Sequence, residues 1–441
     1  MASPLKVGIA GLGTVGASVV GMIARQRDTL AASCGRPIEV VAVCARSRAK
    51  KRGIDLKALR WVADPVDLAT DREIDVFVEL MGGEGDPAKA AIATALAARK
   101  SVVTANKALL ARHGVALAAL AEKNGVTLNF EAAVGGAIPI VKTLREGLAG
   151  NSLARIYGIL NGTCNYILTR MEHDKLSFAD CLKEAQRLGY AEADPTFDVE
   201  GNDTAQKLAI LASIAFGTKV DESAVYVEGI SSIASEDLEW ADELGYRVKL
   251  LGVAVKTDKG IEQRVHPTMV RKDSAIAQVM GVTNAVTVDA AAIAPITLVG
   301  PGAGGMATAS AVVSDIGDIA RGVRTAPFGR PTARLTTSKK APMQRHEGGY
   351  YIRLLAVDKP GTAATIAKRL AQQHISLESI VQRRRGERPH GGDAPGSSGA
   401  PVPVILITYA TTEDAVHKAL AAVGRDKVIS GKPQVIRIEK N

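Results

Sequence analysis

The sequence has few aromatic residues and few cysteines, and neither set forms a recognisable binding motif. Aromatic residues make up 4% of the 441 residues, so the formal net charge of +9 is not accompanied by a basic stripe with interleaved stacking side chains. We therefore expect no nucleic-acid partner. The cysteines form no CxxC pair and no Cys/His cluster, which predicts free thiols in a reducing cytoplasm and no zinc site. They are Cys34, Cys44, Cys164 and Cys181.

Long apolar runs are also missing. No stretch reaches the length needed to span a bilayer, and glycines between Gly8 and Gly16 interrupt the apolar N-terminus, which is not typical of a signal peptide. We expect a soluble, cytoplasmic protein without a membrane partner. A chain of 441 residues is too long for one compact core, so two or three domains are expected.

The first unit that the pattern predicts is a strand, a glycine turn and a helix. Residues 6–10 read as a buried strand, and a helical run continues to residue 23. Between them, Gly11 would allow a tight turn, Gly13 would admit a pyrophosphate, and Gly16 would let the helix pack closely. The motif predicts a dinucleotide site, with a simple glycine-rich packing turn as the alternative. The candidate contacts are Gly11, Leu12, Gly13, Thr14, Val15 and Gly16.

The second predicted strand, over residues 38–45, bears on the choice of cofactor. No acidic residue stands at its end, where a carboxylate would bind the ribose 2′-hydroxyl of NAD. Basic residues follow instead, and they suit the 2′-phosphate of NADP. We predict NADP, with NAD as the second choice; a solvated basic loop is the alternative. The basic residues are Arg46, Arg48, Lys50, Lys51 and Arg52.

Further strands alternate with helices in this part of the chain. Residues 74–80 and 101–105 are apolar and β-branched, and the alanine-rich stretch 86–98 between them reads as a helix. The alternation predicts an α/β fold with a Rossmann-type, doubly wound parallel sheet. Thr104 and Lys107 stand at the carboxyl end of a strand, where such sheets bind ligands, so both are candidate site residues.

The stretch 189–207 concentrates negative charge and ends in a lysine. Its carboxylates are Glu192, Asp194, Asp198, Glu200 and Asp203. Such crowding is costly unless something cationic binds, and the carboxylates could receive the ammonium group of an amino acid. Asn202 is a good N-cap, so a helix should place Asp203 and Lys207 on one face, where the lysine could transfer a proton. The alternative is an ordinary helical ion pair beside a solvated acidic loop.

The pattern changes near residue 131. We expect a first domain over 1–131, completed by about 300–325, and a central α+β substrate and dimerisation domain over 132–300. The nonperiodic stretch 326–348 is read as a linker, which would make the last domain separable. Residues 349–441 show the order βαββαβ of a ferredoxin-like domain, interrupted by a low-complexity loop over 386–402.

Over nearly its whole length the chain resembles the monofunctional homoserine dehydrogenases that carry a C-terminal ACT domain. The resemblance is carried by residues 158–166 (GILNGTCNY), by the stretch 189–207 and by residues 300–305 (GPGAGG). It implies interconversion of L-homoserine and L-aspartate 4-semialdehyde with NAD(P)(H), in threonine, methionine and isoleucine biosynthesis. We expect a homodimer or a dimer of dimers, and no aspartate-kinase part.

The resemblance also implies roles for particular residues. Lys207 looks like the proton donor to the aldehyde oxygen, and Lys107 resembles a lysine close to nicotinamide and substrate. The implied substrate ligands are Glu192, Asp198 and Asp203, and further cofactor contacts are Gly189, Gly302 and Gly304. Some family members hold a monovalent cation such as sodium, for which the carbonyls here would be those of Glu131, Val134, Gly136 and Ile138.

The ACT-like domain implies an amino-acid effector. We expect L-threonine, the end product of the pathway; a domain that only supports oligomerisation is the alternative. Two other functions stay open: an amino-acid-binding regulatory protein without turnover, and a dehydrogenase of another small amino acid. The presence of both Asp203 and Lys207 argues against the first.

Overall fold

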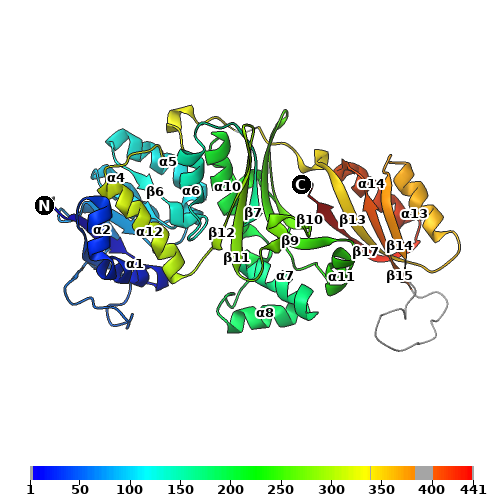
Figure 1. The fold of residues 1–441 in the computed structure, drawn as a ribbon, viewed down its shortest axis with the longest axis horizontal. Coiled ribbons are helices and arrows are strands. Elements are labelled where there is room, and N and C mark those ends of the chain that lie inside the picture. The colour runs from blue at the N-terminus through cyan, green and yellow to red at the C-terminus, as the bar shows by residue number, and fades with distance from the viewer. Residues whose placement is uncertain (1–2, 338, 383–400, 440–441) are drawn as a thin grey trace.

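The computed structural model describes residues 3–337, 339–382 and 401–439. Three parts follow one another along its long axis, as Figure 1 shows: an N-terminal α/β domain, a central domain built on long strands, and a C-terminal domain of strands and two helices. Within the described part of the chain, no helix is long and apolar enough to cross a membrane.

The N-terminal domain is organised around a six-stranded sheet in the order β3-β2-β1-β4-β5-β6. All of its neighbouring strands run parallel. The order reverses between β1 and β4, which confirms the predicted doubly wound sheet and places a ligand crevice at the carboxyl ends of these strands. The strands are β1 (Leu5–Ala10), β2 (Ile38–Cys44), β3 (Arg60–Trp61), β4 (Val76–Glu79), β5 (Ser101–Thr104) and β6 (Leu128–Asn129).

Helices cover this sheet, and one of them comes from much later in the chain. The first five are α1 (Thr14–Arg25), α2 (Arg27–Cys34), α3 (Pro65–Thr70), α4 (Ala88–Ala97) and α5 (Lys107–Asn124). Helix α12 (Gly305–Ala320) lies beside α1 (Figure 1), and its Val312 and Ile316 share a buried cluster with Val7 and Ile9 of β1. Helix α12 thus contributes to the buried core beside β1, although it follows the central strands in sequence.

The central domain is an antiparallel sheet with helices packed against it. Its strands are β7 (Leu153–Ile159), β8 (Tyr226–Val227), β9 (Tyr246–Thr257), β10 (Gly260–Arg271), β11 (Thr283–Ala290) and β12 (Ile293–Pro301). Its helices are α6 (Ile140–Lys142), α7 (Gly162–Asp174), α8 (Phe178–Arg187), α9 (Thr196–Val199), α10 (Asn202–Phe216) and α11 (Ser235–Glu243). Among these central strands, the short strand β8 runs parallel to its neighbour β10, and the other pairings are antiparallel.

Helix α10 lies at the centre of the molecule. Every residue from Asp203 to Ala215 is buried, which fits a helix that is apolar on nearly all sides. The prediction that Asn202 caps this helix is wrong. The cap position is held by Gly201 in the left-handed region (φ 86°), and Asn202 is the first helical residue. A glycine at this position lets the chain turn sharply out of the acidic stretch.

The C-terminal domain confirms the predicted βαββαβ order. Its elements are β13 (Glu347–Ala356), α13 (Thr362–Ala371), β14 (Leu377–Gln382), β15 (Val402–Thr408), β16 (Thr411–Thr412), α14 (Glu413–Arg425) and β17 (Ile429–Ile438). A core that includes Ile352, Leu354, Ile366, Leu370 and Val416 joins its sheet to its helices. The predicted low-complexity loop lies almost wholly outside the described residues.

The central and C-terminal sheets are continuous. Strand β17 pairs in parallel with β10 at Thr268 and Met269, so that one eleven-stranded sheet crosses both domains. The segment that composition predicted to be a linker is anchored as well: Thr336 bridges to Thr218, and Lys340 bridges to Ile261. The C-terminal domain is therefore attached more firmly than the sequence indicated, because strand pairing between domains leaves no trace in local composition.

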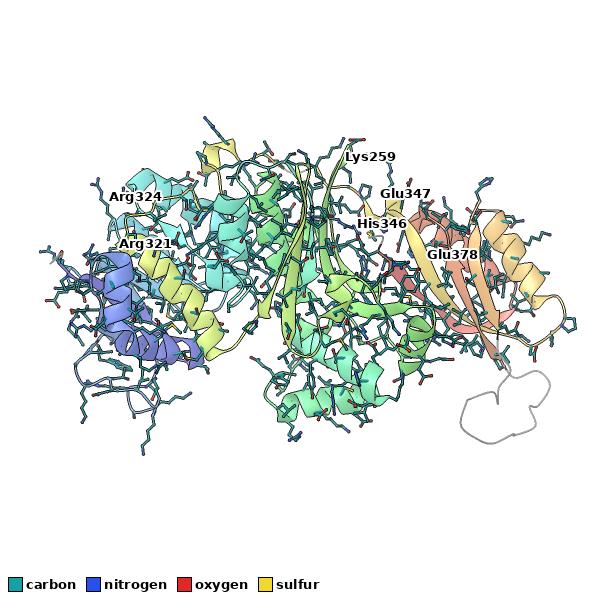
Figure 2. The ribbon with its side chains drawn as sticks, viewed as in Figure 1. Lys259, Arg321, Arg324, His346, Glu347 and Glu378 are labelled. Carbon is teal, nitrogen blue, oxygen red and sulfur yellow. The ribbon has the colours of Figure 1, made fainter. Side chains whose placement is uncertain are left out.

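Polar side chains fill the junction between these two domains. Figure 2 shows His346 and Glu347, at the start of β13, close to the β9–β10 hairpin that carries Lys259. The His346 Nδ1 atom lies 3.0 Å from a carboxylate oxygen of Glu262 on β10. On the other side of the junction, Arg353 donates to the fully buried Asp237 of α11 at 2.6 and 3.0 Å. The two domains thus meet through buried ion pairs as well as through backbone pairing.

Candidate active site

Two lysines flank one buried carboxylate where the N-terminal and central domains meet. Asp203 Oδ2 lies 2.8 Å from Lys207 Nζ, and Asp203 Oδ1 lies 3.2 Å from Lys107 Nζ. Burial acts to raise the pKa of Asp203, but the two ammonium groups prevail and lower it to about 2. Asp203 is therefore ionised at neutral pH and holds both lysines in place.

Lys207 is held at a second point. Its ammonium group also donates to the backbone carbonyl of Leu160, at 2.8 Å, just beyond the end of β7. A lysine ammonium has three N–H donors, and these two bonds direct two of them toward protein atoms. The third is available to an oxygen atom of a bound molecule. This arrangement suits donation of a proton or stabilisation of a developing alkoxide.

Asn161 joins the two aspartates of the acidic stretch. Its side-chain oxygen caps α7 by accepting from the Cys164 amide at 2.8 Å, while its Nδ2 donates to Asp198 at 2.8 Å and to Asp203 at 2.9 Å. Burial and the neighbouring Asp203 raise the pKa of Asp198, against the hydrogen bond from Asn161. We did not identify Asn161 as a site residue from the sequence, although an asparagine at a strand end before a helix is a signal for such a cap.

The remaining carboxylates of the stretch have separate local partners. Asp194 accepts from the Thr196 amide at 3.1 Å, and Glu200 accepts from the Ser231 hydroxyl. Glu192 is exposed, and its backbone carbonyl accepts from Gln186 at 3.0 Å. Only Asp198 and Asp203 therefore converge on Asn161, so the acidic stretch is not one anionic cluster.

The glycine turn has the geometry that a dinucleotide site requires. Gly11 adopts φ 102°, and a Cβ atom there would lie 2.4 Å from the Leu80 carbonyl oxygen. A Cβ at Gly16 would lie 1.9 Å from the Gly11 carbonyl oxygen, whereas no atom of the described part of the chain lies within 4 Å of the corresponding point at Gly13. Gly11 and Gly16 are thus needed for the turn and for packing, and Gly13 leaves room for a phosphate.

Basic side chains line a cavity beside this turn. The cavity has a volume of about 440 Å³, and its wall includes Leu12, Gly13, Thr14, Arg25, Lys50, Lys51, Arg52 and Met306. The Arg52 guanidinium donates to the Leu12 carbonyl at 2.9 Å and so ties the basic loop to the glycine turn. Arg46 and Arg48 are exposed at the start of the loop, and the cavity wall comes from its later part.

A buried glutamate organises the other end of the crevice. Glu79, which is 0% exposed, accepts hydrogen bonds from the amides of Met81 and Gly82 at 2.7 and 3.0 Å and from the Thr104 hydroxyl at 2.7 Å. The Thr104 hydroxyl in turn accepts from the Asn106 amide at 3.0 Å, and Asn106 caps α5 immediately before Lys107. Thr104 therefore helps to set the position of Lys107. The sequence offered only one signal for Glu79, a carboxylate at the end of an apolar strand.

The other predicted cofactor glycines lie at turns. Gly189 (φ 77°) follows α8, and Gly304 (φ 115°) holds the cap position of α12. The start of α12 meets the start of α1, because a Cβ at Gly305 would lie 2.8 Å from the Ser18 hydroxyl. Gly302 packs against Asn284 so closely that a Cβ there would lie 1.9 Å from the amide nitrogen.

The four residues predicted to bind a cation form one buried turn. They are Glu131, Val134, Gly136 and Ile138. The turn touches the segment before α12, since Ala137 donates its amide to the Pro301 carbonyl at 3.0 Å. Burial and Asp315 raise the pKa of the Glu131 carboxyl to about 7. No group of three or more metal-binding side chains occurs among the described residues, so a cation here would rest on carbonyl oxygens.

Comparison with known proteins agrees with this geometry. The family model "Homoserine dehydrogenase" matches residues 139–316, that of its NAD-binding domain matches residues 11–131, and that of the ACT domain matches residues 350–395. Homoserine dehydrogenases of Neisseria gonorrhoeae and Pseudomonas aeruginosa are 43% and 44% identical, each over 99% of both chains.

Solved structures give the same result. A homoserine dehydrogenase from Thiobacillus denitrificans superposes with a TM-score of 0.90 at 42% identity, covering 99% of this chain and 98% of that one. A hyperthermophilic archaeal homoserine dehydrogenase in complex with NADPH has a TM-score of 0.61 at 26% identity, covering 71% of this chain and 97% of that one. The chain belongs to the homoserine dehydrogenase family, NAD(P)-dependent oxidoreductases that act on a CH–OH group.

Proposed function

We propose that Lys207 is the acid and base of the reaction, with NADP(H) as the preferred cofactor and L-threonine as the effector. The observation that carries the assignment is the position of the Lys207 ammonium between Asp203 and the Leu160 carbonyl, each at 2.8 Å. Both contacts accept hydrogen bonds from the ammonium group and hold it in place. They also fix the direction in which its remaining N–H can point.

In the reducing direction, Lys207 donates its proton to the oxygen of L-aspartate 4-semialdehyde as that oxygen gains negative charge. The bound nicotinamide cofactor supplies the hydride. In the oxidising direction, the neutral amine of Lys207 accepts the hydroxyl proton of L-homoserine. Lys107, on the other side of Asp203, adds positive charge near the same oxygen and so stabilises the alkoxide.

The amino group of the substrate requires an anion that the lysines do not already neutralise. Asp203 is engaged by two ammonium groups, whereas Asp198 accepts its side-chain bond from the uncharged Asn161. We therefore assign the substrate ammonium to Asp198, with Glu192 as a second ligand once the exposed loop closes on the substrate.

The cofactor preference follows from the charges beside the glycine turn. Lys50 and Lys51 line the cavity next to Gly13 and Thr14, where they would meet the 2′-phosphate of NADP. Arg46 and Arg48 are close enough in sequence to add to the positive field. The NADPH complex of the archaeal relative supports this choice. Thr104, Gly189, Gly302 and Gly304 would provide further contacts with the cofactor.

We further propose that a monovalent cation such as sodium binds the turn 131–138. The carbonyl oxygens in this turn are buried and crowded against Gly302, since a Cβ at Gly136 would lie 2.4 Å from the Gly302 carbonyl oxygen. A cation would draw these oxygens together and order the segment that precedes α12. Its role would be structural, because the turn contributes no group to the proton transfer.

The assembly that we propose is a homodimer or a dimer of dimers, formed through the central domain. Strand β12 ends the eleven-stranded sheet, and its Ile293 and Val299 are 42% and 57% exposed. Apolar side chains on an edge strand favour pairing with another copy. The L-threonine site is assigned to the C-terminal domain, residues 349–441, which matches the ACT model in part.

One experiment tests the core of this proposal. The absorbance of NADPH is followed with L-aspartate 4-semialdehyde as substrate, and the assay is repeated with NADH. We expect rapid oxidation of NADPH that is at least as efficient as that of NADH. Failure to oxidise either cofactor with this substrate would contradict the assignment.

A further inference from the structure

The last strand of the C-terminal domain is connected, through one short segment of the central domain, to residues 198–203, which carry Asp198 and Asp203 and are called the substrate loop below. This segment, residues 226–231, comprises β8 and the turn after it. It lies against β10 through backbone pairing, and Glu228 donates its amide to the Val265 carbonyl at 2.8 Å. The segment therefore occupies the space between the continuous sheet and the residues that precede α10.

On the side of the active site, the segment packs against residues 199–201 without space to spare. A Cβ at Gly229 would lie 2.5 Å from both the Glu200 Cα and the Val199 carbonyl oxygen. The Ile230 amide donates to that same carbonyl at 2.9 Å, and the Ser231 hydroxyl donates to Glu200. Residues 199–201 join the end of α9, which carries Asp198, to the start of α10, which carries Asp203, so their position sets both aspartates.

On the other side, the segment is held by Arg437 of β17, whose exposure is 4%. Its NH1 atom lies 2.8 Å from Glu228 Oε2, and the Tyr226 hydroxyl donates to the same oxygen at 3.1 Å. The Arg437 guanidinium also lies over the Tyr226 ring at 5.2 Å. A second carboxylate, Glu413 at the start of α14, accepts from Arg437 Nε at 2.9 Å and fixes the guanidinium from within the C-terminal domain.

The Glu228–Arg437 ion pair is not surrounded by continuous apolar packing. A cavity of about 820 Å³ opens beside it, lined by the segment, by Glu200 and Asn202, and by residues 432–435 of the C-terminal domain. Polar side chains around an open space provide little packing energy. The Glu228–Arg437 pair therefore carries much of the connection between β17 and the segment.

We infer that Glu228 and Arg437 are positioning residues for the reaction, and that the C-terminal domain supports the substrate loop through them even without an effector. The pair holds residues 226–231, these hold residues 199–201, and that stretch sets the distance between Asp198 and Asp203. The inference rests on the proposed role of Asp198 in binding the substrate ammonium.

The test compares Glu228→Gln with the native enzyme in the full chain. Glutamine keeps the shape of the side chain but removes the charge that faces Arg437. We expect the KM for L-homoserine to rise about five- to twentyfold, with a smaller fall in kcat and an unchanged Kd for NADPH. Arg437→Lys should also raise the KM for L-homoserine. The guanidinium of arginine contacts Glu228 and Glu413 at the same time, whereas the single ammonium group of lysine cannot reach both. The double variant should raise the KM no more than the single variant with the larger effect, because both substitutions remove the same interaction.

Arg353→Lys is the matched control. Arg353 also crosses from the C-terminal to the central domain and also binds a buried carboxylate, but its partners Asp237 and Glu236 lie on α11. The variant Arg353→Lys should lower the melting temperature without changing the KM for L-homoserine. An unchanged KM in Glu228→Gln, or an equal rise in Arg353→Lys, would overturn the inference. If the native enzyme itself showed no activity with L-homoserine, the proposed function would be contradicted instead.

Discussion

Lys207 Nζ and Asp203 Oδ2 lie 2.8 Å apart on the first turns of α10, and both side chains are nearly inaccessible to solvent. On a helix surface a pair with this spacing would contribute only a few tenths of a kcal/mol. In a buried position the loss of either partner leaves an uncompensated charge, which costs far more. The pair therefore stabilises α10, in addition to the role in proton transfer that we propose for Lys207.

Replacing Lys207 tests its role directly. We expect Lys207→Ala to lower kcat by at least about two orders of magnitude while the Kd for NADPH changes little, because proton transfer contributes to the barrier and not to cofactor affinity. Lys207→Arg should not restore turnover, since a guanidinium does not release its proton at working pH. Steady-state kinetics and a fluorescence titration would measure both quantities. Near-native turnover of Lys207→Ala would remove the lysine from the mechanism.

The cofactor prediction concerns Lys50, with Arg46 as its companion on the same loop. A phosphate contact with a lysine contributes about 1.5 to 3 kcal/mol, so Lys50→Ala should weaken NADPH binding about tenfold or more and leave NADH binding nearly unchanged. Arg46→Ala should also weaken NADPH more than NADH. Its effect should be the smaller one, because Arg46 is exposed and lies outside the cavity wall. Equal losses for the two cofactors in either variant would show that its cation does not read the 2′-phosphate.

The buried carboxyl of Asp315 predicts a dependence of stability on pH. Burial raises its pKa to about 6, above its ordinary value of 3.8, against the influence of Lys142. A raised folded pKa stabilises the protein at low pH, and this stabilisation is lost as the pH rises through about 6. Asp315→Asn keeps an oxygen that can accept from the Glu131 amide and removes the charge.

The stability of Asp315→Asn relative to the native enzyme should therefore improve from pH 5 to pH 8, by roughly a few degrees in melting temperature. Calorimetry at several pH values would measure the difference. The Glu131 carboxyl should also make the native enzyme less stable as the pH rises, because its pKa is raised to about 7. A melting-temperature difference that stays constant between pH 5 and pH 8 would contradict the assignment.

The features that the sequence predicted well are those set by local spacing. Lys207 follows Asp203 by one helical turn, and Lys107 follows a strand of a parallel sheet, so general rules placed both in the site. Asn161 and Glu79 were not found, because their partners are far away in sequence: Asn161 is joined to Asp203 across 42 residues and Glu79 to Thr104 across 25. Neither contact is visible until the fold brings the residues together.

The domain junction was missed for a related reason. Composition indicated a linker over 326–348, and that stretch is indeed irregular in sequence. The pairing of β17 with β10 depends instead on backbone groups, which carry no sequence signature. Likewise, Gly201 and not Asn202 caps α10, in a left-handed turn where an added Cβ would lie 3.2 Å from Val227, a residue distant in sequence.

We predict that L-threonine inhibits the enzyme, and the structure suggests a variant that tests this inhibition in the intact chain. Gly361 precedes α13 at the turn that resembles the start of ACT domains, and it adopts φ 91°, with no atom of the described residues within 4 Å of an added Cβ. Gly361→Ala would therefore act through backbone strain of about 1 kcal/mol and not through a clash. We expect L-threonine at millimolar concentration to inhibit the native enzyme and to inhibit Gly361→Ala several-fold less, with equal activity of the two when threonine is absent.

Gly424 provides the control for this experiment. It lies within α14 of the same domain, and it does not adopt a positive φ. Among the residues that the structure describes, no atom comes within 4 Å of an added Cβ there. Gly424→Ala should leave threonine inhibition unchanged, because alanine is favourable inside a helix. Calorimetric titration with L-threonine would report binding separately from inhibition. Full activity of the native enzyme at millimolar threonine, with no heat of binding, would show that threonine is not the effector and would favour a C-terminal domain that only supports assembly.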